Sequence, residues 1–282
     1  MKNVIEIRGM TKRYDGFTLD HVNLDVPGGT IMGLIGENGA GKSTLIKGIL
    51  GLTHCEGECR ILGQPLTDGL KNEIGVVLDE SMFHDALDSM QIEKILSGVF
   101  SGWDKRLYVD YLDKFQLPAK KLLKEFSRGM KMKLSIATAL AHRPKVLILD
   151  EATGGLDPVV RNEILDEFIN FVSDEEHGVL ISSHITSDLE RAADYVTYLH
   201  QGTVFLTGEK DELLRSYGRL VCSTSDLELL PKDELLGLRQ GKFGCEALVR
   251  DRQTFARRYA GLLIESVSLE DIMVFTGRGE RT

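Results

Sequence analysis

The sequence has few cysteines, no long apolar run and no excess of basic residues. Its 282 residues include four cysteines, which are too few and too scattered for a disulfide framework. No apolar run approaches the roughly 20 residues that cross a bilayer, so we expect no membrane-spanning helix. With 34 basic against 43 acidic residues, the net charge of −9 disfavours a general nucleic-acid-binding protein, although it leaves room for a local basic patch.

Two short features need an interpretation before the main motif is considered. Cys55 and Cys59 flank a turn beside His54, but no second pair of ligands follows at zinc spacing, so we interpret both as ordinary thiols. The first residues of the chain alternate as in a strand and do not resemble a signal peptide. We therefore expect a protein of the cytoplasm, or one peripheral to the cytoplasmic face of a membrane.

The segment 36–43 reads Gly-Glu-Asn-Gly-Ala-Gly-Lys-Ser and fits the phosphate-loop pattern G-x-x-x-x-G-K-[ST]. An apolar run of strand length precedes it at 30–35, and a helical segment follows it at 44–50. This arrangement points backbone N–H groups and the positive end of a helix at a phosphate. Lys42 can then reach the β- and γ-phosphates, and the hydroxyl of Ser43 can ligate Mg²⁺. The residues predicted to bind the nucleotide here are Gly36, Glu37, Asn38, Gly39, Ala40, Gly41, Lys42, Ser43 and Thr44.

The order of apolar segments predicts an α/β fold. Alternation over 4–8 and 17–26, with Asp15-Gly16 between them, predicts an antiparallel hairpin. The apolar runs that end in polar residues predict strands of a parallel sheet, at 74–78, 146–149 and 178–183.

Helical patterns occupy about 85–140, and the first domain is expected to end near residue 206. The rest of the chain is expected to form a small α/β appendage without a chemical motif. Its predicted strands and helices are 219–223, 245–249 and 263–267, and 253–260 and 269–275.

The phosphate loop, Asp150-Glu151 and His184 follow one another along residues 1–206. With these motifs in this order, the sequence resembles the ATP-binding subunits of ABC transporters. The segment 126–130, Phe-Ser-Arg-Gly-Met, resembles the signature sequence of that family. The resemblance implies a P-loop NTPase core with an antiparallel β subdomain, an inserted helical subdomain at about 85–140 and a C-terminal domain at 207–282.

The resemblance also implies a role for each residue at the ends of the strands. Asp150 would hold Mg²⁺ through water or together with Ser43, because carboxylate oxygens suit that ion. Glu151 would act as the general base on the attacking water, and His184 would contact the γ-phosphate. Lys42 would offset the charge of the transferring phosphoryl group. Each residue taken alone is compatible with a structural role, but their combination with the loop indicates an ATPase site.

Other residues are implied to act across a pair of ATP-binding subunits. Ser127 and the amide of Gly129, at the start of a helix, would cap the nucleotide of a second subunit. Asp157 matches the family loop that crosses between the two sites. Tyr14 matches the aromatic position that stacks on adenine, and its alternative role is packing.

The sequence departs from the family pattern at several positions. Arg128 replaces the first glycine of the signature, and its side chain either adds charge toward the phosphates or points to solvent. Asp79 stands where a glutamine is usual, followed by Glu80, and we expect Asp79 to contact the metal. Ala152 and Gly154 replace the more common proline and serine.

We therefore predict a subunit that binds and hydrolyses ATP, pairs with a second ATP-binding subunit and drives a separate membrane permease. A bacterial exporter, such as those for antibiotics and peptides, is the expected subclass, and no nucleic-acid partner is expected. The alternative is a soluble ABC-type ATPase that acts on ribosomes or nucleic acid. A nucleotide sensor without turnover is a third reading, against which Glu151 argues.

Overall fold

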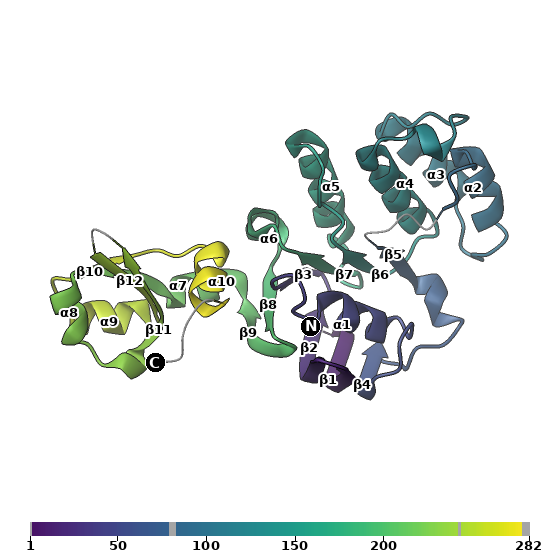
Figure 1. Ribbon diagram of the computed structural model, residues 1–282. Helices are drawn as coiled ribbons and strands as arrows, with labels where there is room; N and C mark the ends of the chain where they lie inside the picture. Colours follow the sequence, from purple (N-terminus) through teal and green to yellow (C-terminus); the bar gives the residue numbers. More distant parts are fainter. Residues whose placement is uncertain (1, 79–82, 242–243, 278–282) are drawn as a thin grey trace.

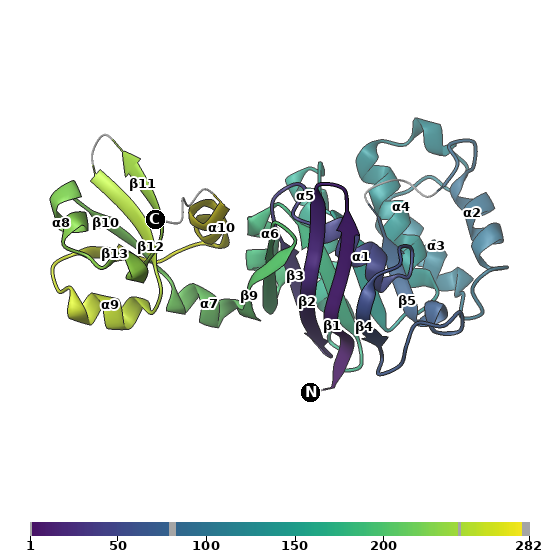
Figure 2. The same ribbon diagram turned by 60° about the horizontal axis from the view of Figure 1, so that its bottom comes forward.

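The computed structural model describes residues 2–78, 83–241 and 244–277. Two views show an elongated molecule with a central body, a helical subdomain at one end and a C-terminal domain at the other (Figures 1 and 2). This arrangement matches the expected α/β fold with an antiparallel β subdomain, an inserted helical subdomain and a small C-terminal appendage.

The main sheet has six strands in the order β5-β6-β7-β3-β8-β9. The first five run parallel, and β9 pairs antiparallel with β8. Their bounds are Thr30–Ile35 (β3), Ile74–Val77 (β5), Val146–Asp150 (β6), Gly178–Ser183 (β7), Tyr195–His200 (β8) and Thr203–Glu209 (β9). Every residue of β3, β6 and β7 is buried, which confirms that these apolar runs are strands covered on both faces.

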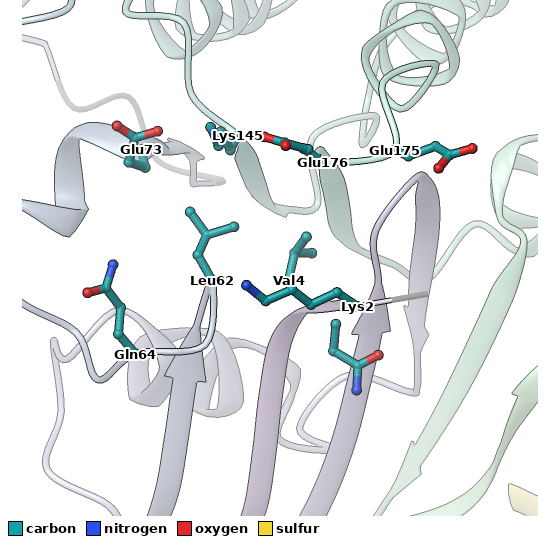
Figure 3. Close-up of a pocket in the computed structure, with 9 residues that line it drawn as sticks. Lys2, Val4, Leu62, Gln64, Glu73, Lys145, Glu175 and Glu176 are labelled. Carbon is teal, nitrogen blue, oxygen red and sulfur yellow. Dashed lines mark hydrogen bonds and ion pairs between the residues drawn. The ribbon is translucent and has the colours of Figure 1, made fainter.

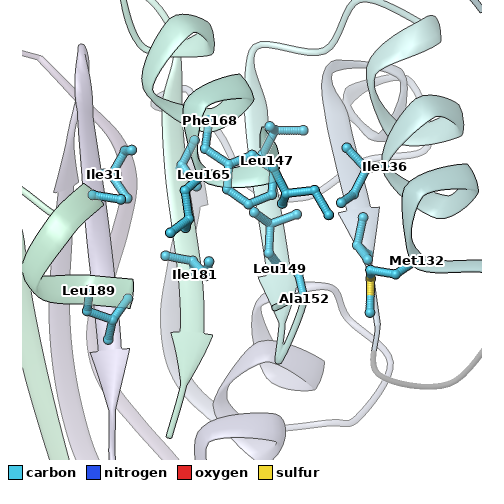
Figure 4. Packing of buried hydrophobic residues seen from close by; sticks show 14 of the residues in the cluster. Ile31, Met132, Ile136, Leu147, Leu149, Ala152, Leu165, Phe168, Ile181 and Leu189 are labelled. Carbon is cyan, nitrogen blue, oxygen red and sulfur yellow. The ribbon is translucent and has the colours of Figure 1, made fainter. Parts of the chain in front are cut away.

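Successive residues of these strands belong to two different cores, one on each face of the sheet. On one face, Leu147 of β6 lies beside Phe168 of α5 (Pro158–Phe171), in a core that also includes Leu189 of α6 (Thr186–Ala192), as Figure 4 shows. On the other face, Ile148 packs with residues of α1 (Lys42–Ile49). The sheet therefore holds its strand ends rigidly between two packed layers.

The predicted hairpin forms a second, antiparallel sheet beyond α1. Strands β1 (Asn3–Tyr14) and β2 (Phe17–Pro27) meet at the turn of residues 15–16, and β4 (Glu56–Ile61) pairs with the free edge of β1. This sheet has the order β2-β1-β4. The antiparallel β subdomain thus lies where the sequence predicted it.

The helical subdomain contains α2 (Ser89–Leu96), α3 (Lys105–Lys114) and α4 (Arg128–Ala141). Tyr108 and Leu112 of α3 are buried, and the hydroxyl of Tyr108 donates a hydrogen bond to the Ser89 carbonyl at 2.8 Å. Helix α4 begins at Arg128, where the Ser127 side chain caps it by accepting from the Met130 N–H. In the part of the chain that the structure describes, no helix is long and apolar enough to cross a membrane.

The C-terminal domain is a four-stranded antiparallel sheet in the order β11-β12-β10-β13. The strands are Gly218–Cys222 (β10), Leu235–Gly241 (β11), Gly244–Val249 (β12) and Leu263–Glu265 (β13), and the helices are Lys210–Ser216 (α7), Thr224–Glu228 (α8), Arg252–Arg258 (α9) and Leu269–Gly277 (α10). Strand β11 and helix α8 were not expected from the sequence. Strand β9, which belongs to the main sheet, continues past the proposed boundary at residue 206.

Candidate functional site

The phosphate loop connects the carboxyl end of β3 to the first turn of α1. Two of its glycines are required by close contacts. A Cβ atom on Gly36 would lie 2.5 Å from the Leu199 carbonyl oxygen, and one on Gly41 would lie 2.8 Å from Cζ of Phe17. Gly41 also has φ of 109°, which L side chains rarely adopt. The glycines therefore let the loop wrap tightly between β8 and the hairpin.

Lys42, the first residue of α1, is nearly buried beneath this loop, with 7% of its side chain exposed. Its Nζ donates hydrogen bonds to the carbonyl oxygens of Gly36 at 2.7 Å and Glu37 at 3.3 Å. The same Nζ lies 3.5 Å from Glu151 Oε1, across the cavity floor. The loop thus holds a cation in a fixed place at its centre.

Glu151 follows β6 directly and has φ of 53°, an unusual backbone conformation for a residue other than glycine. Its N–H donates to the carbonyl and hydroxyl oxygens of Ser182 at 3.2 and 3.1 Å, which holds this turn in place. Its carboxylate, 16% exposed, contacts Lys42 on one side. On the other side Oε2 lies 2.6 Å from Nδ1 of His184. The carboxylate is therefore oriented by two groups from different elements.

Asp150, the last residue of β6, is buried next to this turn. The hydroxyl of Ser182, on the neighbouring strand β7, donates to Asp150 Oδ1 at 2.5 Å. Among the described residues, no group of three or more His, Cys, Asp or Glu has the arrangement of a metal cage. Mg²⁺ is commonly held by one or two protein oxygens together with phosphates and water, so the donor pair of Asp150 and Ser43 fits that ion chemically.

A cavity of about 700 Å³ opens above these groups. The structure brings nine of the predicted site residues to its wall, together with four that were not predicted to bind. The predicted ones are Glu37, Asn38, Gly39, Gly41, Lys42, Ser43, Thr44, Glu151 and His184, and the others are Gly16, Phe17, Arg128 and Gly154. Of the remaining loop residues, Ala40 is buried and Gly36 packs against β8.

Five further candidates lie outside the wall of this cavity: Asp150, described above, and four others. Tyr14 is 48% exposed at the end of β1, with Lys12 Nζ 5.2 Å from its ring centroid. Ser127 caps α4, which also contains Gly129, and Asp157 caps α5 by accepting from the N–H groups of residues 159 and 160.

Asp79 and Glu80 lie outside the described residues. Asp79 therefore stays a predicted metal contact.

Several residues of the site were not found from the sequence. Phe17 packs on the loop, and His200 shares a hydrogen bond with Glu37 from the end of β8. Ser182 was visible only as a polar residue after an apolar strand. These residues come from strands distant in the sequence, so only the fold shows that they meet.

A second cavity, of about 530 Å³, lies at the opposite edge of the sheet, where β5 and β6 begin (Figure 3). Its wall includes Glu73, Glu176 and Lys145, and Lys145 Nζ forms an ion pair with Glu176 at 2.7 Å. Open α/β sheets bind ligands at the carboxyl ends of their strands. The first cavity is therefore the candidate site.

Cys55 and Cys59 are consistent with ordinary thiols. Burial raises the pKa of Cys59 to about 11 and that of Cys55 in the same direction. The reactive thiolate is thus disfavoured at both positions.

This combination of fold and cavity defines a phosphate-loop nucleoside triphosphatase. Residues 19–154 match the family model described as "ABC transporter". The lantibiotic transport ATP-binding protein SrtF of Streptococcus pyogenes is 35% identical over 212 residues, which cover 74% of this chain and 92% of SrtF. The bacitracin transport ATP-binding protein BcrA of Enterococcus faecalis is 36% identical, over 72% of this chain and 68% of BcrA.

Solved structures agree with these relatives. One, an ATP-binding subunit of an ABC transporter, has a TM-score of 0.68 and 29% identity, over 75% of this chain and 92% of the other. The chain belongs to the family of ABC transporter ATP-binding proteins. Proteins of this family bind ATP and are ATPases coupled to transport through a membrane permease. The comparisons give no support to an ATPase that acts on ribosomes or nucleic acid.

Proposed function

We propose that this chain binds ATP with Mg²⁺ in the 700 Å³ cavity, hydrolyses it and thereby drives export by a separate permease. The observation that carries the proposal is the carboxylate of Glu151, held between Lys42 and His184 at the floor of that cavity. A fixed carboxylate next to a phosphate-binding loop is suited to accept a proton from an attacking water.

Each residue near the carboxylate has a proposed part in binding or hydrolysis. Lys42 and the N–H groups of the loop would stabilise the charge on the β- and γ-phosphates. Glu151 would orient and deprotonate the water, and His184, bonded to Glu151, would fix its direction and contact the γ-phosphate. Ser43 and Asp150 would hold Mg²⁺, which when bound supplies positive charge to the phosphate oxygens.

A second ATP-binding subunit, identical or different, is proposed to complete the site. Ser127 is exposed at the N-terminus of α4 and does not line the cavity of its own chain. It and Gly129 therefore remain available to cap a partner's nucleotide, and Asp157 would lie where the two sites meet. Tyr14 is proposed to stack on adenine from the hairpin whose residues Gly16 and Phe17 line the cavity.

The permease is proposed to dock on the helical subdomain, at about residues 85–140. Ile95 on α2 and Val99 just after it are 51% and 66% exposed there, which gives a partner apolar contacts. This docking would place the chain on the cytoplasmic face of the membrane. Because SrtF and BcrA are transport proteins for a lantibiotic and bacitracin, we propose an exporter of peptide antibiotics or related molecules. Residues 1–206 and 207–282 stay our proposed domains.

The Glu151→Gln variant tests the proposed hydrolysis. It keeps the size of the side chain but removes the base, so ATP binding is expected to persist. Phosphate release should fall at least ~100-fold, the contribution typical of a positioned base. The matched control is Glu163→Gln, an exposed glutamate of α5 outside the cavity. Unchanged phosphate release in Glu151→Gln would contradict the assigned base.

A second experiment tests the transport partner. The chain should co-purify with a multi-spanning membrane protein when isolated from its own cells in mild detergent. Recovery with ribosomes and no membrane protein would contradict the proposal.

A further inference from the structure

The side chain of Arg128 lies against the loop that follows Glu151. Arg128 is the first residue of α4, and a Cβ atom on Gly155 would lie 2.8 Å from its Nη1 and 3.1 Å from its Cζ. A Cβ atom on Gly154 would lie 3.8 Å from its Nη2. The guanidinium therefore rests on two consecutive glycines, at a distance that a side chain on Gly155 would not permit.

This placement brings the guanidinium to the nucleotide cavity of its own chain. Arg128 and Gly154 line the same cavity as Lys42, Glu151 and His184. The sequence left two directions open for Arg128, toward the phosphates or into solvent. The side chain remains exposed, yet it lies at the wall of the cavity in which the phosphates are proposed to bind.

The chemistry of the guanidinium suits a phosphate group at this wall. Its planar fork of N–H donors can bind two phosphate oxygens at once and stays charged at every physiological pH. A second cation of the wall, Lys42, donates hydrogen bonds to loop carbonyls and faces Glu151. A terminal phosphate that enters the cavity would thus meet two cations of its wall, Lys42 from the loop and Arg128 from the start of α4.

We propose that Arg128 is a phosphate-binding residue of its own chain's site, with Gly155 as the platform for its guanidinium. It would contact the terminal phosphate of the nucleotide on the loop of the same chain. This inference rests on the proposed nucleotide site and adds a residue to it. It differs from the proposed role of Ser127 and Gly129, which act on a partner's nucleotide.

The first test compares nucleotides with and without the terminal phosphate. Binding of a non-hydrolysable, fluorescent ATP analogue and of fluorescent ADP is measured for Arg128→Ala, Arg128→Lys and the wild type. We expect Arg128→Ala to weaken analogue binding about 3- to 10-fold, as for an exposed charge-assisted contact, and ADP binding less than about 2-fold. Arg128→Lys should recover part of the loss, because it keeps the charge but not the fork.

The control for this test is Arg106→Ala, which removes an exposed arginine from α3 outside the cavity. It should bind both nucleotides as the wild type does. An equal loss for the analogue and ADP in Arg128→Ala, or no loss, would overturn the role of Arg128 while leaving the nucleotide site in place. A wild-type chain that binds neither nucleotide would instead refute the site itself, and the inference with it.

An experiment with mixed subunits tests whether Arg128 contacts the nucleotide of its own chain or that of a partner. The Arg128→Ala chain is mixed with an excess of Lys42→Ala chain, which keeps Arg128 but lacks the lysine of the loop. If Arg128 acts within its own chain, analogue binding by the Arg128→Ala chain stays weak in the mixture. Recovery of wild-type affinity would show action on the partner's nucleotide and overturn the proposal.

Gly155→Ala tests the platform. The new methyl group should displace the guanidinium and reduce analogue binding to a similar extent as Arg128→Ala. The double variant should show no further loss, because both changes remove one interaction. Fully additive losses would contradict the platform, and a thermal melt of each variant confirms that it is folded, since φ at Gly155 is 70°.

Discussion

The main sheet and the C-terminal sheet bury their strands in different ways. Strands β3, β6 and β7 are buried at every residue, between helices on one face and helix α1 on the other. Strand β10 alternates between buried and half-buried residues and faces one small core. In the main sheet only the strand ends are open to ligands, so Asp150, Glu151 and His184 meet there. An antiparallel sheet sends neighbouring strands in opposite directions and gathers no such edge.

The two sheets are nevertheless joined through a shared core. Ile272 and Phe275 of α10 belong to the same buried cluster as Leu189 of α6. The N–H of Leu269 also donates to the side chain of Glu190 on α6 at 2.6 Å. Since α6 begins two residues after His184, the C-terminal domain supports the helix that carries this end of the site.

Two truncations of buried aliphatic side chains distinguish the core that the domains share from the core that lies within the C-terminal domain. Ile272→Ala removes contacts between the domains, and Leu220→Ala removes contacts within the C-terminal core. Each is expected to lower the free energy of unfolding of the region around its core by about 2–5 kcal/mol. In calorimetry with and without ATP, Ile272→Ala should lower the melting transition that ATP stabilises. Leu220→Ala should create an earlier transition and leave the ATP-dependent one in place.

One result for this pair of variants would contradict the prediction. If both lower the ATP-dependent transition equally, the chain unfolds as one unit and the two cores are not separable. Each variant should first be shown to be folded at low temperature by circular dichroism.

How far the fold could be predicted depended on the pattern in each region. Runs such as residues 146–149 are continuous and flanked by polar residues, so both the strand and its burial could be predicted. Strand β11 could not, because Gly237, with φ of 70°, interrupts its alternation between Leu236 and Leu238. A bulge of this kind removes the period on which the prediction depends.

The site divides in the same way. Lys42 was predicted from the phosphate-loop pattern, and Glu151 and His184 were predicted from the resemblance to the ATP-binding subunits of ABC transporters. Ser182, Phe17 and His200 support them from other strands, and no local pattern distinguishes a supporting serine from any other. The position of Arg128 was left open because its direction depends on the glycines at 154 and 155, which are distant in the chain.

The variants Ser182→Ala and Ser223→Ala compare a serine near the end of a main-sheet strand with one that follows a strand of the C-terminal sheet. The Ser182 hydroxyl donates to Asp150 and accepts from the N–H of Glu151, so its loss should reduce phosphate release about 10-fold, as for a pair of hydrogen bonds. The control is Ser223→Ala, which removes the hydroxyl that caps α8 after β10.

Ser223→Ala should destabilise its helix by about 1 kcal/mol and leave hydrolysis unchanged. A loss of hydrolysis in Ser223→Ala equal to that in Ser182→Ala would show that the effect is one of general stability. Steady-state phosphate release and thermal melts of both variants give the two measurements.

The smallest expected effect concerns the pH dependence of stability that arises from histidine, which should belong to the main domain alone. All seven histidines precede residue 201, so the C-terminal domain contains none. His142 ends α4, is 4% exposed and stacks on Phe100 with 4.2 Å between ring centroids. Its Nε2 lies 3.1 Å from the Ile74 carbonyl oxygen. Burial holds the pKa of His142 below its ordinary value of 6.5, because the charged ring would lose its hydration.

The sign of the effect follows from proton binding in the two states. As the pH falls through 6.5, the ordinary pKa of this side chain, the unfolded chain takes up a proton at His142 before the folded chain does. The free energy of unfolding therefore decreases toward lower pH. In melts between pH 7.5 and 5.5, His142→Gln should show a smaller decrease than the wild type, and the difference should appear only in the ATP-dependent transition. A transition of the C-terminal domain that changed with His142 would instead couple α4 to the distant sheet and break the contrast between the two regions.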